Sequence, residues 1–105
     1  MPKPSPSPAT IFAELVNRVV RGPGTAPMKM RLAASGTGTD SMPREAVPVI
    51  EKVRAHAYQV TDADIAALKA AGLDEETIFE LVIAAACGVA ERRLDRAMEV
   101  IDAAG

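Results

Sequence analysis

Hydrophobic residues recur three and four positions apart along most of the chain, which is the spacing of one face of an α-helix. The first such stretch follows Ser7, a good N-cap residue, and Pro8, whose missing amide costs nothing in a first helical turn. Its apolar positions are Phe12, Leu15, Val16, Val19 and Val20. The Gly-Pro-Gly triplet at 22–24 is expected to end this helix.

Proline and glycine interrupt the chain before residue 60, so the next helices are predicted to be short. One is opened by Pro27 and runs through Ala34. Its apolar contacts are Met28, Met30 and Leu32. Residues 35–40 are Ser, Gly, Thr and Asp, a composition that predicts a loop. A further helix covers about residues 43–58 and is bent or restarted at Pro48. Its inward stripe is Ile50, Val53 and Ala57.

Two helices of the second half carry clear signals at their ends. Thr61 and Asp64 form a capping box in which Asp replaces the usual Glu, and Gly72 suits a left-handed C-terminal cap. The inward positions between them are Ile65 and Leu68. Asp74 is then the expected N-cap of the last helix.

The last helix is predicted over residues 75–103, about 43 Å at 1.5 Å per residue. A globule of 105 residues has a diameter of about 34 Å, so this helix must protrude, bend near Gly88 or lie against a second subunit. We favour a second subunit, because residues 78–90 are apolar almost all round and need cover on every side.

Composition divides the chain into a flexible Pro-rich tail, residues 1–8, and a single helical domain, residues 9–105. All eight Pro and four of the seven Gly lie within residues 1–48, so the helices of this stretch are expected to be repeatedly interrupted. Twenty Ala and only three aromatic residues indicate a core built from close helix contacts rather than from large side chains.

The remaining composition excludes several classes of function. The chain has one Cys, which rules out an internal disulfide framework. With only one His in addition, it has too few of the usual zinc ligands, so no metal site is predicted. A net charge of −2 provides no basic field for nucleic acid. The longest apolar run, residues 78–90, is too short to span a membrane, and no signal peptide precedes it. We therefore expect a cytoplasmic protein without a cofactor, a nucleic-acid partner or a membrane partner.

Residues 60–73 read VTDADIAALKAAGL, residues 80–86 read ELVIAAA, and an Arg-Leu pair follows at 93–94. This succession resembles the second half of a domain of the AhpD-like superfamily, which includes the carboxymuconolactone decarboxylases and alkylhydroperoxidases. The likeness covers about residues 47–98. It implies an all-helical bundle that assembles as a dimer, trimer or hexamer.

The peroxidase members of that superfamily use a Cys-x-x-Cys pair on a helix of the first half, with a nearby Glu and a His that relays protons. That chemistry needs one thiolate to attack and a second to resolve the intermediate. Here the first half contains no Cys, and the long helix departs from the family pattern after Ala86. The resemblance therefore implies the fold but not the thiol chemistry.

Cys87 follows Glu80 by seven residues, so both project from nearly the same helix face. One interpretation makes Cys87 a peroxide-reactive thiol with Glu80 as its proton partner. A neighbouring carboxylate raises the pKa of a thiol, however, whereas reactivity needs a lowered one. We favour a structural Cys, since a small buried thiol packs well in an Ala-rich run.

Glu80 is the one acid among residues 78–90, where a carboxylate must be paired or hydrogen-bonded. It is either a general acid or base, or it pairs with an arginine or reaches solvent, which we favour. The candidate partners are Arg54, Arg92 and Arg93. Residues 91–99 mix both charges at helical spacing and predict a salt-bridged, exposed face.

His56 has two interpretations: it belongs to a pocket together with Tyr58, or it is a solvated or capping residue near a helix end. We favour the second, because the surrounding stretch is amphipathic and no second His accompanies it.

These observations predict an all-α fold of four to six helices, an AhpD-like helical bundle completed by oligomerisation. The function expected is that of a small oligomeric protein without thiol peroxidase activity, whose residues 47–103 form the interface. The alternative is an alkylhydroperoxidase or carboxymuconolactone decarboxylase-type enzyme acting on peroxides or on a small organic acid or lactone. Its catalytic residues would be Glu80, Cys87 and His56. A small-molecule ligand is an open alternative for either class.

Overall fold

The computed structural model describes residues 8–105, and every regular element in this range is helical. Its elements are α1 (Pro8–Arg21), α2 (Met28–Ser35), η1 (Arg44–Ala46), α3 (Val47–His56), η2 (Ala57–Gln59), α4 (Asp62–Ala70) and α5 (Glu75–Ala104). The predicted all-α class and helix number are confirmed for this part of the chain. The predicted tail, with the Ser7 cap, lies outside the described residues except for Pro8, which begins α1.

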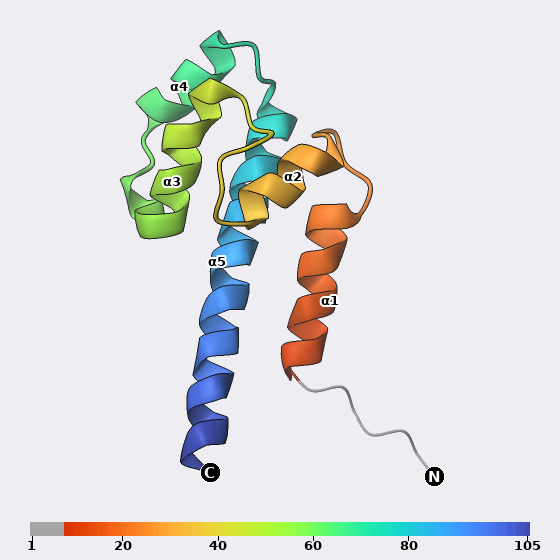
Figure 1. Cartoon of the computed structure of the whole chain (residues 1–105). Helices are drawn as coiled ribbons and strands as arrows, with labels where there is room; N and C mark the ends of the chain where they lie inside the picture. The colour runs from red at the N-terminus through yellow and green to blue at the C-terminus, as the bar shows by residue number, and fades with distance from the viewer. Residues whose placement is uncertain (1–7) are drawn as a thin grey trace.

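Helix α5 runs the length of the molecule, and the other helices pack around it (Figure 1). Helix α1 lies antiparallel beside its lower half, α2 crosses its middle, and α3 and α4 flank its upper half (Figure 1). The principal extents are 55 × 29 × 23 Å, and the radius of gyration is 15.8 Å rather than the roughly 13 Å of a compact chain of this length. The molecule is elongated because α5 continues unbroken beyond the helices that cover it.

Residues 78–90 are buried mainly by other helices of the same chain. A cluster of small and branched side chains joins α1, α2, α3 and α5. Its buried members are Val16, Val20, Ala26, Ala34, Ile50, Val53, Leu81, Ala84 and Ala85. A second cluster joins η1, α3, α4 and the start of α5 through Ala46, Val49, Leu68 and Ile78. Only Phe79, Ala86 and Ala90 of residues 78–90 are exposed, so a second subunit is not needed to bury this run.

The caps predicted in the second half are confirmed. Thr61 and Asp64 form the capping box, and Gly72 has a φ of +99°, the left-handed conformation that favours glycine. Asp74 accepts a hydrogen bond of 2.8 Å from the backbone N–H of Thr77 at the start of α5.

Three apolar positions predicted from helical spacing are exposed, and Leu15 of α1 is one of them, with 50% exposure. Met28 is 48% exposed, because α2 turns its Arg31 and Ala34 face toward the core and leaves its first residue at the surface. Ala57 is exposed because His56 has φ −151° and ψ 81°, which breaks the register of α3 before the η2 turn.

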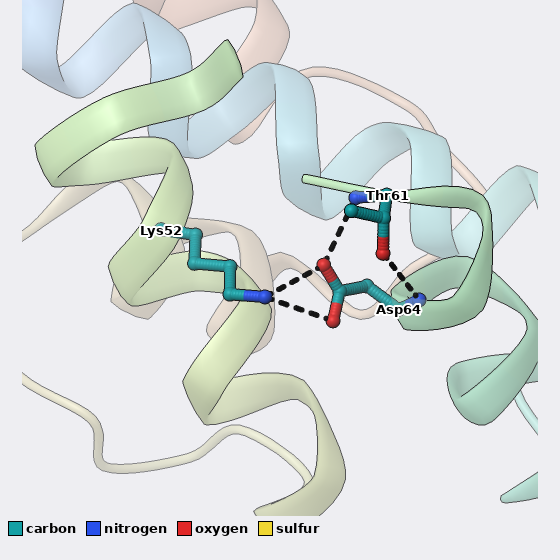
Figure 2. Close-up of polar contacts among 3 residues, drawn as sticks. All are labelled: Lys52, Thr61 and Asp64. Carbon is teal, nitrogen blue, oxygen red and sulfur yellow. Dashed lines mark hydrogen bonds and ion pairs between the residues drawn. The ribbon is translucent and has the colours of Figure 1, made fainter. Parts of the chain in front are cut away.

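Figure 2 shows how α3 is tied to the start of α4. The two carboxylate oxygens of Asp64 accept hydrogen bonds of 3.0 and 2.9 Å from Nζ of Lys52, and one of them also accepts from the N–H of Thr61 at 2.9 Å. The Lys52 hydrogen bond, followed by that of Thr61, holds the pKa of Asp64 below its ordinary value. The ionised carboxylate therefore stabilises the α3–α4 connection.

We expect Asp64→Asn to destabilise the fold at pH 7 and to lose this effect in acid. Because the folded-state pKa of Asp64 is lowered, its stabilisation is present above the unfolded-state value near pH 4 and disappears as pH falls through the folded-state value. Urea unfolding of the variant and the native chain at pH 7, 5 and 3 measures the difference. The control is Asp62→Asn, an exposed first-turn acid. An Asp64→Asn deficit that does not shrink at pH 3 would contradict this account.

Gly88 is the point of closest approach between α5 and α2. A Cβ added to Gly88 would lie 2.0 Å from the carbonyl oxygen of Ser35 and 2.7 Å from its carbonyl carbon. These are backbone atoms at the end of α2, so they cannot rotate away as a side chain would. A glycine inside a helix normally costs stability, and its presence here is explained by this contact.

The substitution Gly88→Ala separates helix propensity from packing. Propensity alone predicts a gain of about 0.5–1 kcal/mol, whereas the clash with Ser35 predicts a loss of about 1–3 kcal/mol. We expect the loss, measured by urea unfolding. Ala90→Gly, at an exposed site of the same helix, calibrates the propensity term. A Gly88→Ala chain more stable than the native one would show that the contact is not close.

Candidate functional site

The carboxylate of Glu80 binds the turn between α1 and α2. It accepts hydrogen bonds from the backbone N–H of Thr25 at 2.8 Å and of Ala26 at 2.5 Å. A Cβ on Gly24 would lie 2.8 Å from Oε1 of Glu80, so the turn passes directly over this carboxylate. None of the ion pairs within residues 8–105 includes Glu80. Within residues 8–105, Glu80 thus pairs with none of the candidate arginines, and backbone amides from 54 and 55 positions away take their place.

Arg31 lies at the same turn and was not found by sequence reasoning: a Cβ on Gly24 would lie 3.3 Å from the central carbon of its guanidinium group, close to the carboxylate of Glu80. Its side chain is buried, with 4% exposure, and its Nε donates to the carbonyl of Ala26 at 3.1 Å. Its Nη1 donates to the carbonyl of Val19 at the end of α1 at 3.0 Å. Arg31 and Glu80 therefore both hold the α1–α2 turn, the cation through the carbonyls of Val19 and Ala26 and the anion through the amides of Thr25 and Ala26.

Two arginines bind the opposite end of α2. Nη2 of Arg54 donates to the carbonyls of Ala33, Ala34 and Gly38 at 2.9, 3.2 and 2.8 Å. Nη1 of Arg92 donates to the carbonyl of Ser35 at 2.8 Å. Cations are favourable at a helix C-terminus, where carbonyl groups lack partners inside the helix. The expected salt-bridged surface of residues 91–99 is thus present only in part, as the 3.3 Å pair of Arg96 and Glu99.

Cys87 is a free, half-buried thiol that packs against the first core cluster. Burial, and then the nearby carboxylate of Glu91, raises the pKa of this thiol above its ordinary value. A raised pKa reduces the thiolate fraction near neutral pH, which is the opposite of what a nucleophilic Cys needs. Cys87 shares a helix face with Glu80, but Glu80 directs its oxygens to the turn rather than to the thiol.

His56 lies at the exposed end of α3 and contacts only Tyr58 among aromatic rings, at 5.5 Å between centroids. Tyr58 is itself 82% exposed, so the two rings do not enclose a pocket. No hydrogen bond or ion pair in the described range joins His56, Glu80 and Cys87 to one another. The structure therefore does not bring the three predicted site residues together.

The surface hollows lie elsewhere. A hollow of about 580 Å³ between α4 and the start of α5 is lined by Ile65, Lys69, Glu75, Glu76, Ile78, Phe79 and Val82. Smaller hollows of about 330 and 410 Å³ lie along α3 and the middle of α5 and include Arg54 and Arg93. Residues 8–105 contain no group of three or more His, Cys, Asp or Glu side chains arranged to hold a metal ion. No helix in the same range is long and apolar enough to cross a membrane.

No protein-family model, curated protein or solved structure matches the chain. The relationship to the AhpD-like superfamily, which rests on the sequence likeness of residues 47–98, therefore stays a prediction.

We expect Cys87 to react slowly with a disulfide reagent such as dithionitrobenzoate at pH 7.5. Burial and the raised pKa together should make the folded chain about tenfold or more slower than the same chain unfolded in urea. Absorbance of the released thionitrobenzoate follows the reaction, and the unfolded chain is the internal control. Equal or faster reaction in the folded state would support an activated thiol instead.

Proposed function

We propose that this protein is a small self-associating helical protein without thiol peroxidase activity, whose subunits pair through the projecting ends of α1 and α5. The observation that carries the proposal is a set of exposed or half-buried apolar side chains on these two neighbouring helices, here called the apolar strip. The strip consists of Ile11, Leu15, Leu94, Met98 and Ile101. Ile11 and Ile101 are 55% and 61% exposed, while Leu94 is half-buried.

The α5 part of the strip continues the inward face of the helix. At 100° per residue, Leu94, Met98 and Ile101 point in nearly the same direction as Cys87, which packs against the core. Helix α1 has 14 residues and α5 has 30, so α1 covers about 21 Å of a helix about 45 Å long. The face of α5 that packs into the core therefore continues past the end of α1, where no helix of this chain covers it.

A second copy of the chain is the partner that this strip fits. Helices α1 and α5 run antiparallel (Figure 1), and two such pairs can meet about a two-fold axis, each copy offering the same apolar strip. This arrangement covers eight branched side chains per dimer, six of which are at least half exposed in the single chain, and two Met side chains. The AhpD-like resemblance, which implies oligomers, supports the same conclusion.

Enzyme activity is the weaker alternative. Cys87 has a raised pKa, Glu80 is engaged by two backbone amides, and His56 lies apart from both. A general acid, a nucleophile and a base that do not meet cannot act on one substrate. The proposal therefore excludes thiol peroxidase chemistry. If the protein binds a ligand, side chains other than Cys87, Glu80 and His56 bind it.

The strip predicts self-association that depends on two of its residues. We expect sedimentation equilibrium to show a mass that rises above 11.0 kDa with concentration, and the double variant Met98→Gln and Ile101→Gln to remain near that monomer mass. Both side chains are exposed, so the monomer fold should tolerate the change. The control is Val100→Gln, which alters a 55% exposed residue on another face of α5. A native chain that stays monomeric to about 1 mM, or a double variant that associates like the native chain, would refute the proposal.

A further inference from the structure

Four arginines line one hollow beside the C-terminal end of α2. Arg54 comes from α3, and Arg92, Arg93 and Arg96 come from two successive turns of α5. The only other lining residue is Val89, and the hollow measures about 330 Å³. No carboxylate of residues 8–105 lines it, so four like charges face a shared space, and only Arg96 has an acidic partner, Glu99.

Two of these guanidinium groups are held in place by neutral partners. Arg54 is fixed by the carbonyls of Ala33, Ala34 and Gly38, and Arg92 by the carbonyl of Ser35. Carbonyl oxygens satisfy the N–H donors but carry no full charge. The two groups are therefore positioned in advance, and no ion pair within residues 8–105 includes either of them.

Arg54 also has a donor without a partner. Its Nε is buried and makes no hydrogen bond. Burial first, and then the neighbouring Arg92, lowers the pKa of Arg54, while Glu51 opposes this effect. Buried donors in folded proteins normally have a partner, so the Nε of Arg54 is an exception among the described residues.

The other two arginines are available to a ligand. Arg93 takes part in none of the ion pairs found in residues 8–105. Arg96 pairs with Glu99 at 3.3 Å, but their side chains are 77% and 68% exposed. A pair so exposed contributes little, and an anion can replace Glu99 as the partner of Arg96.

An apolar hollow adjoins the basic one. It measures about 410 Å³ and shares Val89 and Arg93 with its neighbour. Its other walls are formed by small side chains of α3 and α5, among them Val53, Ala86 and Ala90. The two hollows therefore offer a basic end and an apolar end to one ligand.

We propose that these adjoining hollows bind a small phosphate monoester, with the phosphate among the four arginines and its apolar body against Ala86, Val89 and Ala90. Guanidinium groups match phosphate oxygens in geometry, and a phosphate dianion compensates more of the four charges than a carboxylate does. The arginines of α5 point to the side opposite Met98, so this site does not depend on the proposed self-association.

The test uses phenyl phosphate, inorganic phosphate and phenol, each titrated into the full chain and followed through the amide resonances of residues 86–96. We expect saturable binding of phenyl phosphate, binding of inorganic phosphate at the same amides about tenfold more weakly, and no saturable binding of phenol. Absence of saturable shifts with phenyl phosphate up to about 10 mM would overturn the proposal.

Matched variants decide whether the arginine hollow is the site. Arg93→Gln is expected to weaken phenyl phosphate binding about tenfold or more, since it removes one charged contact without disturbing the α2 cap. Arg44→Gln removes the same charge from an exposed position on η1 and should leave binding unchanged. Equal weakening by both variants would mean that net charge alone attracts the anion, and the proposal would be wrong.

Two further experiments ask whether the phosphate belongs to a small molecule, a lipid or a nucleic acid, and whether binding depends on self-association. Vesicles containing phosphatidic acid and a single-stranded oligonucleotide are tested in the same way, and binding to either one without binding to phenyl phosphate would contradict a small-molecule site. The double variant Met98→Gln and Ile101→Gln should keep full affinity for phenyl phosphate. Failure of self-association would thus leave the phosphate site intact, and the two proposals can fail separately.

Discussion

Helix α2 has eight residues, too few to be stable as an isolated helix, and it owes its place to charged side chains that reach its two ends from α3 and α5. Glu80 holds the turn before it through the amides of Thr25 and Ala26, while Arg54 and Arg92 hold its last carbonyls. An acid before the N-terminus and bases at the C-terminus also match the helix dipole. Between these contacts, Gly88 lets the end of α2 approach the backbone of α5.

We call the contacts of Glu80, Arg54 and Arg92 with the two ends of α2 the α2 clamp. The arrangement of the neighbouring helices follows from this clamp. Because the turn before α2 is fixed by Glu80 and Arg31, α1 is directed back along α5 and covers only part of it. The uncovered remainder of α5 carries Met98 and Ile101, which belong to the apolar strip proposed for self-association. Arg54 and Arg92 both reach the C-terminal end of α2, and this brings their guanidinium groups together. They lie on the side of α5 opposite the face that carries Met98. The same clamp thus produces both the apolar strip and the basic hollow.

Local signals were enough to predict the helices but not their partners. Thr61, Gly72 and Asp74 determine helix ends through atoms three or four residues away, so sequence spacing identified them. The partners of Glu80 lie 54 and 55 residues away and are backbone amides, which carry no residue identity. No pattern of side chains could have named them.

Distant backbone partners also explain why the sequence did not predict the burial of Arg31 or the basic hollow. Arg31 occupies an inward position of a short, weakly amphipathic helix, and only its carbonyl partners at Val19 and Ala26 make its burial acceptable. The arginines of residues 91–99 were expected to pair with neighbouring acids along the helix. Arg92 instead finds Ser35, 57 residues away, because α2 ends there.

Native-state hydrogen exchange tests the clamp most directly. If side chains of α3 and α5 hold α2 as described, the amides of residues 31–35 should exchange with the same free energy as those of residues 81–85, through global unfolding of the chain. Exchange of residues 31–35 through a local opening, at a free energy well below that of residues 81–85, would show that α2 is not held and would contradict the account.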